Sequence, residues 1–324
     1  MDLSDLTQLR QAWPVSAMQD STARSPLAIA AATNLRGIAI MLLARILFAI
    51  SDTFTKLATE TLPGTEVVTL RNMIALPVVF AMAVRLGALR HWTAITDGKV
   101  LSRSLLDGIG TIAFVIALPH VMIAQSTVIL LTVPIILVAL SALIYREEVG
   151  WRRWTAILMG FLGVFLVAGP AGGAPNTFLI ITQMAAIAWA FRDLFTSRIG
   201  KGIPSVMVSL IATVAVALIS LPGIFAGDWR GVTATEALYL FAAGTFVATA
   251  NFSYISALRT GAIAVVAPFR YTAALWAAVA GFFVWGDVPD VMGIFGTLLI
   301  VGSGLYTLYR EMEVAKAKVR QQPQ

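Results

Sequence analysis

Four charged residues lie inside strongly apolar stretches of this chain. Arg45, Asp52, Arg71 and Arg270 are each flanked by Ile, Leu, Val, Ala or Phe. A charged side chain near the middle of a bilayer costs from about 2.5 to more than 10 kcal/mol, so such residues usually face a polar cavity or a partner of opposite charge. A guanidinium group carries a fork of donors that suits anionic or carbonyl-rich ligands. We therefore expect these four residues to line a cavity that binds a polar solute.

Asp52 and Arg71 are expected at similar depth on neighbouring helices. The first helix runs toward the turn at Pro63 and Gly64, the second runs away from it, and each rises about 1.5 Å per residue. Two interpretations stay open: a structural ion pair between the helices, or a solute site in which Asp52 also takes up a proton. Lys56, one helical turn from Asp52, is expected to extend toward the outer membrane interface. Asp287, at a predicted loop end, is expected to be a solvated turn residue.

Aromatic residues near these charges could provide flat walls for a solute. Tyr254, Tyr271 and Trp276, together with Phe48, are the candidates. An aromatic face attracts a cation and stacks on a planar ring. Aromatic residues in membrane spans also serve as packing or lipid-facing residues, and this alternative is left open for each of them.

Two further acids, Asp107 and Asp193, are candidates for gating or proton coupling. Both are expected near the cytoplasmic ends of their spans, where acids also form local pairs with neighbours such as Arg192. The chain has no cysteine, and its two histidines, His91 and His120, fall in predicted loops. No metal site, cofactor or catalytic constellation is therefore expected.

The composition is that of an integral membrane protein. Hydrophobic residues make up 58% of the chain, charged residues only 12%, and the mean hydropathy is +0.84. Soluble proteins average roughly 45–50% apolar and about 25% charged residues. The formal charge of +6 does not indicate a nucleic-acid partner, because most of the basic residues fall in short loops between spans.

Gly, Pro and charged clusters divide the apolar sequence into ten predicted membrane spans. Lys and Arg gather in the loops on one side, whereas Arg230 alone lies on the other. This bias predicts a cytoplasmic location for both termini and insertion in the inner, or plasma, membrane. The predicted spans are 35–57, 64–84, 101–118, 121–144, 152–169, 177–197, 204–225, 234–257, 262–285 and 289–309.

The second half of the chain echoes the first. The segment Asp52-Thr-Phe-Thr55 recurs as Asp193-Leu-Phe-Thr196, each followed by a proline, and Glu147 corresponds to Asp287. Each half holds an odd number of spans, so the halves must be inserted with opposite orientation. This inverted repeat is a common plan of secondary transporters, with the solute site between the halves near the midplane.

The predicted fold is therefore an all-α polytopic membrane protein of ten transmembrane helices, arranged as two inverted five-helix repeats. We expect a cytoplasmic N-terminal tail, a short helix within it near 4–13, and a cytoplasmic C-terminal tail. Pro134 and Pro268 fall within spans and are expected to kink them. The predicted divisions are 1–34 for the first tail, 35–169 and 177–309 for the two repeats, and 310–324 for the second tail.

Several short motifs resemble the drug/metabolite transporter superfamily, specifically its EamA-type members. The segment Ala267-Pro-Phe-Arg-Tyr-Thr-Ala-Ala-Leu-Trp276, followed by Trp285-Gly-Asp-Val-Pro-Asp290, is similar to the ninth and tenth spans of that family, and Gly302-Ser-Gly-Leu-Tyr306 adds to the likeness. Ser51-Asp-Thr-Phe-Thr-Lys56 and the Arg270-Tyr271 pair look most like bacterial carriers of S-adenosylmethionine or riboflavin. The resemblance implies a ten-helix carrier of small solutes.

The expected function is secondary transport of an amino-acid-, nucleoside- or flavin-like solute by alternating access. The expected partners are this solute and the lipid bilayer, and a homodimer is left open. The sequence contains no Gly-x4-Gly-Lys-Ser/Thr motif for nucleotide-driven transport. The alternatives are a membrane-embedded lipid or prenyl transferase, which would need clustered acids or a nucleophile, and a passive channel, which would need a selectivity filter.

Overall fold

The computed structural model describes residues 26–145, 151–168, 176–196, 198–200, 202–226, 229–260 and 263–321. Within these residues all the regular secondary structure is helical. The α-helices are α2 (Pro26–Thr59), α3 (Gly64–Arg85), α4 (Gly98–Ala117), α5 (Ile123–Leu130), α6 (Val133–Tyr145), α7 (Trp151–Ala168), α8 (Thr177–Thr196), α9 (Ser205–Ser220), α10 (Ala234–Thr260), α11 (Ile263–Val266), α12 (Ala273–Trp285) and α13 (Val291–Gln321). The 3-10 helices are η2 (Ala88–Thr96), η3 (Leu118–His120), η4 (Leu221–Ala226) and η5 (Ala267–Thr272).

The order of spans follows the prediction. In the described part of the chain, nine helical segments are long and apolar enough to cross a membrane, and a shorter apolar helix over Trp154–Val167 takes the place of the fifth predicted span. Helix α2 begins at Pro26, nine residues before the predicted start of the first span at residue 35. The helix predicted near 4–13 lies outside the described residues, as does Glu147.

Two spans are broken near their prolines, as predicted. The fourth divides into α5 and α6 just before Pro134, and the ninth into α11, η5 and α12 around Pro268. Proline has no backbone N–H, so the carbonyl four residues before it loses its helical donor. Both breaks lie within a membrane span.

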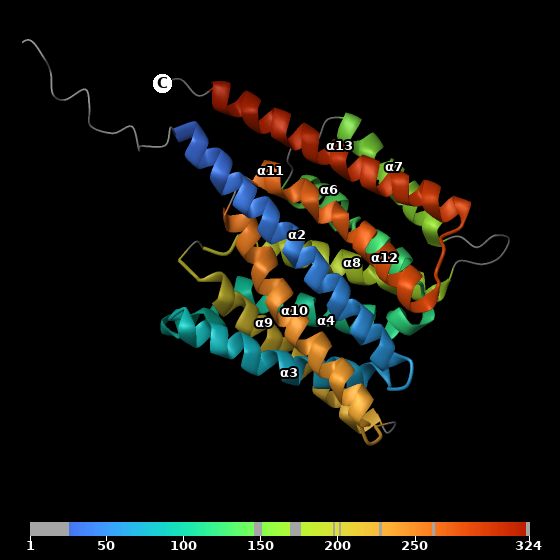
Figure 1. The fold of residues 1–324 in the computed structure, drawn as a ribbon. Helices are drawn as coiled ribbons and strands as arrows, with labels where there is room; N and C mark the ends of the chain where they lie inside the picture. The colour runs from blue at the N-terminus through green and yellow to red at the C-terminus, as the bar shows by residue number, and fades with distance from the viewer. Residues whose placement is uncertain are drawn as a thin grey trace, which may run out of the picture.

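The helix packing shows the two-fold relation between the halves. Helix α2 packs along α10, and its counterpart α8 packs along α4, the counterpart of α10. Helices α3 and α9 contact each other, as do α7 and α13. Figure 1 shows α7 and α13 side by side, with the start of α2 and the end of α13 on the same side of the molecule. This exchange of partners is what two inverted five-helix repeats produce.

Glycine allows α7 and α13 to approach closely. A Cβ atom added at Gly163 would lie 2.7 Å from the carbonyl oxygen of Gly296, and one added at Gly296 would lie 2.6 Å from that of Gly163. Small residues of this kind bring helix backbones together in membranes, where van der Waals packing replaces the hydrophobic effect as a driving force.

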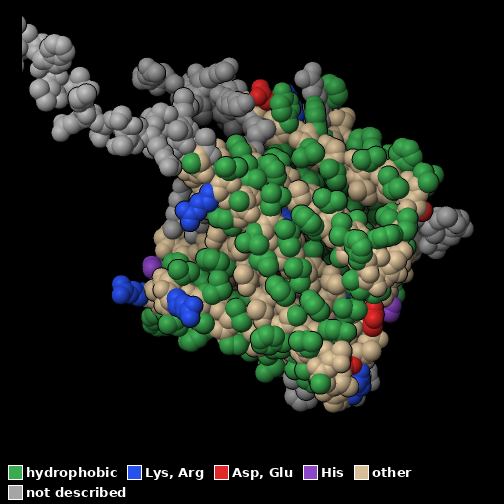
Figure 2. All heavy atoms as spheres, in the orientation of Figure 1, with side chains coloured by type: hydrophobic (Ala, Val, Ile, Leu, Met, Phe, Trp, Pro, Cys, Tyr) green, Lys and Arg blue, Asp and Glu red, His purple; other side chains and the backbone are tan. Residues whose placement is uncertain are grey.

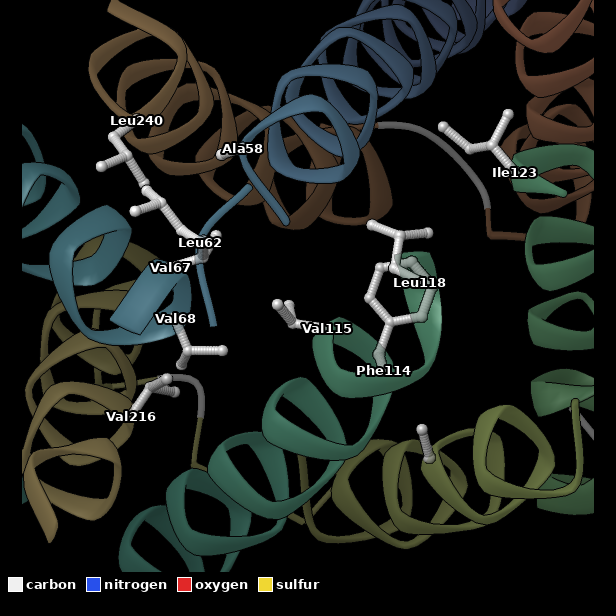
Figure 3. Packing of buried hydrophobic residues seen from close by; sticks show 11 residues of the cluster. Ala58, Leu62, Val67, Val68, Phe114, Val115, Leu118, Ile123, Val216 and Leu240 are labelled. Atoms are coloured by element: carbon white, nitrogen blue, oxygen red, sulfur yellow. The ribbon is translucent and has the colours of Figure 1, made fainter. Parts of the chain in front are cut away.

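The surface and the interior are both apolar. Hydrophobic side chains cover the middle of the face in Figure 2, and charged side chains lie mainly toward its borders. Inside, Leu62 and Val67 flank the turn between α2 and α3, and they belong to one buried cluster with Leu118, Val216 and Leu240 (Figure 3). The cluster packs both repeats together at the end of the bundle that contains this turn.

Candidate functional site

A cavity lies between the two repeats, in contact with helices from both. It has a volume of about 160 Å³. Phe114 and Ile123, which belong to the buried apolar cluster, close it on one side. The other polar and aromatic residues in its wall are Arg45, Phe48, Asp52, Arg71, Asn72, Arg103, Asp107, Thr111, Thr127, Trp189, Arg192, Ser209, Thr213, Asn251, Tyr254 and Arg270.

Two arginines from different repeats share one aromatic ring in this cavity. The Cζ atom of Arg45 lies 4.6 Å from the ring centroid of Tyr254, and that of Arg270 lies 5.8 Å from the same centroid. Phe48 packs against Tyr254 edge to face at 6.3 Å. Neither arginine has a carboxylate within 4 Å among the described residues, and both Nε atoms are buried there without a hydrogen-bond partner.

The two arginines and the tyrosine are positioned by one broken span and two continuous helices. Arg270 lies in η5, the break in the ninth span, whereas Arg45 and Tyr254 lie on the long helices α2 and α10, which pack along each other. Two guanidinium groups near one ring repel each other in a medium of low dielectric constant. An anionic group bound between them would relieve that repulsion and take up their free donors.

Asp52 and Arg71 both line the cavity but do not form an ion pair. Arg71 is 3% exposed, and its Nη1 donates to the hydroxyl of Thr55 at 3.2 Å. The Asp52 carboxylate has no hydrogen bond or ion pair with the described residues, so it faces the cavity without a fixed partner. The interpretation of these two residues as a structural pair is therefore not supported.

A second charged group joins α4 to α8. The Arg192 guanidinium contacts Asp107 at 2.8 Å and Asp193 at 2.8 Å. Arg103 lies 3.5 Å from Asp107 and donates from Nε to the hydroxyl of Thr196 at 3.3 Å. Asp107 and Asp193 were predicted as gating or proton-coupling residues, and the structure places both in a network between the repeats, with Asp107 at the cavity wall.

Tyr271 and Trp276 do not line the cavity. The Tyr271 side chain is 7% exposed and points at α13, where its hydroxyl would collide with a Cβ atom at Gly304. The indole N–H of Trp276 is buried without a partner among the described residues. Neighbouring residues in a helix point in different directions, so Arg270 faces the cavity while Tyr271 packs behind it.

The sequence analysis missed several cavity residues, among them Arg103, Trp189 and Asn251. Arg103 precedes Asp107 by four positions, and Asn251 precedes Tyr254 by three. Residues three or four apart share one face of a helix. Helical spacing from the residues already chosen could have found them.

Lys56 and Asp287 correct two further predictions. Lys56 does not extend to the interface: it is 6% exposed, and its Nζ donates to the carbonyl oxygen of Val121 at 2.8 Å and lies 3.8 Å from Asp287. The same nitrogen lies 4.4 Å from the ring centroid of Trp285. Asp287 is thus not a solvated turn residue, and α2 is joined to two turns at the end of the bundle that contains the apolar cluster.

No group of three or more His, Asp or Glu side chains suited to a metal ion occurs in the described ranges. The charged groups at the cavity are arginines and aspartates, and the arginines outnumber the acids. Chemically, this arrangement can bind and orient an oxygen-rich solute through charge-assisted hydrogen bonds.

Comparison with known proteins places the chain among membrane carriers. A profile of the EamA-like transporter family matches residues 35–169 and 177–309. The S-adenosylmethionine uptake transporter of Rickettsia prowazekii (strain Madrid E) is 24% identical over 286 residues, which cover 88% of this chain and 97% of that protein. The riboflavin transporter of Vibrio cholerae serotype O1 is 30% identical over 275 residues, which cover 82% and 91%.

More distant similarities extend the range of named solutes and support the fold. The pseudopaline exporter CntI of Pseudomonas aeruginosa (strain UCBPP-PA14) is 20% identical over 266 residues, which cover 82% of this chain and 93% of that protein. A solved crystal structure matches with a TM-score of 0.61 at 18% identity, covering 86% of this chain and 98% of that chain. The named relatives differ in the solute for which they are named.

Proposed function

Because the chain belongs to the EamA-like transporter family, with both halves matched, we propose that it moves a small organic metabolite across the membrane by alternating access of its two repeats. In this proposal the units of transport are residues 35–169 and 177–309, flanked by cytoplasmic tails, and the chain is inserted in the inner membrane. The relatives are named as transporters, and a catalytic role is not part of the proposal.

One observation carries the assignment of the solute site: Arg45 and Arg270, from opposite repeats, share Tyr254 at the cavity wall without an acidic partner among the described residues. Buried cations that lack a protein partner are costly unless a ligand neutralises them. The proposed solute therefore presents an anionic or carbonyl-rich group to the two guanidinium groups and a flat surface to the tyrosine ring.

The remaining predicted residues take distinct parts in the proposal. Asp52 faces the cavity and Arg71 lies in its wall, so both are proposed to contact the solute, and Asp52 is also the first candidate for carrying a coupling proton. Asp107 and Asp193 are proposed to act in gating, because Asp107 of α4 bonds to Arg192 of α8 across the two repeats and Asp193 holds Arg192 from within α8. Tyr271 and Trp276 are left out, because neither side chain lines the cavity.

The size of the cavity supports alternating access. Its volume of about 160 Å³ is below the roughly 300–1,000 Å³ of pockets that hold drug-sized ligands. A drug-sized metabolite would therefore fit only if the helices around the cavity separate. The apolar cluster and the Lys56–Asp287 contact close one end, so separation at the other end would admit the solute.

S-adenosylmethionine and riboflavin are the first solutes to test, because relatives are named for them. Purified protein in proteoliposomes is expected to show saturable uptake and counterflow of its solute. A channel would show neither, and an enzyme would release a changed product. A thermal-shift screen against amino acids, nucleosides, flavins and S-adenosylmethionine selects further solutes, because a ligand that binds only the folded form raises the melting temperature.

Two substitutions test the site. Arg270→Ala removes one guanidinium group and Asp52→Asn removes the unpaired carboxylate, and each is expected to abolish or strongly reduce transport at an unchanged expression level. Arg85→Ala serves as the matched control, because Arg85 ends α3 and is exposed. Wild-type transport rates in both cavity variants would refute this assignment of the site.

A further inference from the structure

An aromatic side chain in the wall of the cavity joins α8 of one repeat to α4 of the other. Trp189 of α8 lines the cavity, and its indole edge lies against Gly110 of α4. A Cβ atom added at Gly110 would be 2.6 Å from Nε1 and 2.7 Å from Cδ1 of Trp189. Ordinary contacts of a Cβ atom begin at 3.4 Å. Any side chain at position 110 would therefore displace the indole ring or the helix.

The other sides of the indole ring are occupied as well. Phe114 lies one turn beyond Gly110 on α4, with its ring centroid 5.7 Å from that of Trp189. The Arg192 guanidinium lies 5.4 Å from the Trp189 ring and is itself held by Asp107. The indole ring also borders the cavity, so the cavity is space into which the ring can move.

Glycine in the middle of a helix is unfavourable by roughly 0.5–1 kcal/mol relative to alanine. The presence of Gly110 within α4 is therefore expected to have a reason in side-chain packing. The close approach of Trp189 supplies it. We infer that Gly110 and Trp189 together set the width of the cavity, and that Trp189 is a residue that determines which solutes fit by size. This inference rests on the proposed function only in taking the cavity as the solute site.

The natural absence of cysteine allows a test that needs no knowledge of the solute. Ser209 of α9 lines the same cavity, and Ser209→Cys gives a single reactive thiol there. Its reaction rate is measured with two uncharged reagents of different size, methyl methanethiosulfonate and benzyl methanethiosulfonate. Because neither reagent carries a charge, the arginines do not affect the comparison.

Gly110→Ala is expected to slow the benzyl reagent relative to the methyl reagent by on the order of tenfold, since one methylene group of misfit is worth roughly that much in a closed pocket. Adding Trp189→Phe, whose smaller ring leaves room for the alanine, should restore the ratio. Gly302→Ala is the matched control, because a Cβ atom there meets nothing within 4 Å.

An unchanged ratio of the two rates in Gly110→Ala would overturn the inference, whether both rates keep their wild-type values or both fall by the same factor. If Gly110→Ala does not fold, Trp189→Phe alone decides, because it should raise the benzyl rate relative to the methyl rate. A wild-type protein that transports neither riboflavin nor S-adenosylmethionine would count against those two solutes only. The ratio of labelling rates would still test whether Gly110 and Trp189 set the width of the cavity.

Discussion

Lys56 and Asp287 form an ion pair between the end of α2 and the turn before α13, with 3.8 Å between Nζ and Oδ2. The pair links the first repeat to the second, and Lys56 also donates to the carbonyl oxygen of Val121. Lys56→Met keeps the length of the side chain and removes its charge. It leaves a largely buried carboxylate and a carbonyl without their donor, which costs about 1–3 kcal/mol.

Thermal unfolding in detergent measures this effect, and the melting temperature of Lys56→Met is expected to be lower than that of the wild type. Lys99→Met is the control, because Lys99 is exposed in the first turn of α4. Equal melting temperatures for the two variants would show that the pair does not stabilise the closed end of the bundle.

Tyr254 is expected to matter through its ring and not through its hydroxyl. Tyr254→Phe keeps the aromatic face beside Arg45 and Arg270, whereas Tyr254→Leu removes it. Stacking of a flat solute on this ring is worth about 0.5–1.5 kcal/mol, so Tyr254→Leu should raise the half-saturation concentration roughly 2- to 13-fold. Counterflow over a range of solute concentrations measures it. A larger loss in the Phe variant than in the Leu variant would contradict this role of the ring.

Gly163 and Gly296 are expected to be intolerant of alanine. Each would place a Cβ atom within 2.7 Å of the opposite backbone, and neither α7 nor α13 can yield without separating. Overpacking of this kind typically costs about 1–3 kcal/mol. The amount of monodisperse protein after heating reports it, with Gly302→Ala, on the same helix α13 as Gly296, as the control. If Gly163→Ala and Gly296→Ala resist heating as well as the control does, overpacking between α7 and α13 is contradicted.

The sequence was sufficient for the architecture. Apolar length, punctuation by Gly and Pro, and the Lys and Arg bias predicted the order of the spans, and the prolines predicted the breaks that place Arg270. These signals are local: each depends on a short window of residues and on the energy of a polar group in lipid. The location of Arg45 and Arg270 inside the helix bundle could be predicted for the same reason.

Contacts between side chains that lie far apart in the sequence could not be predicted. Lys56 resembles an interface lysine by its position, and only the fold brings Asp287 and Trp285 to it. Tyr271 and Arg270 are adjacent, yet one packs against α13 and the other faces the cavity. Direction around a helix axis depends on the neighbouring helices, which a single sequence does not reveal.

The central claim is that Arg45 and Arg270 face a water-accessible cavity between the repeats. Ala49 lies in the cavity wall on α2, and Leu43 on the same helix is 49% exposed on the outer surface. Single cysteines at these positions, in protein reconstituted in liposomes, compare an aqueous with a lipid-facing site. The anionic sulfonatoethyl and the cationic trimethylammonium-ethyl methanethiosulfonates then report the sign of the local charge.

The reaction rate of Ala49→Cys with these two reagents is therefore the most direct measurement. The account predicts that both reagents react with this thiol. The ratio of the anionic to the cationic reaction rate should be roughly tenfold higher than the same ratio for a fully exposed cysteine, and Arg270→Gln should lower it. An Ala49→Cys thiol as unreactive as that of Leu43→Cys, or a preference that Arg270→Gln leaves unchanged, would contradict it.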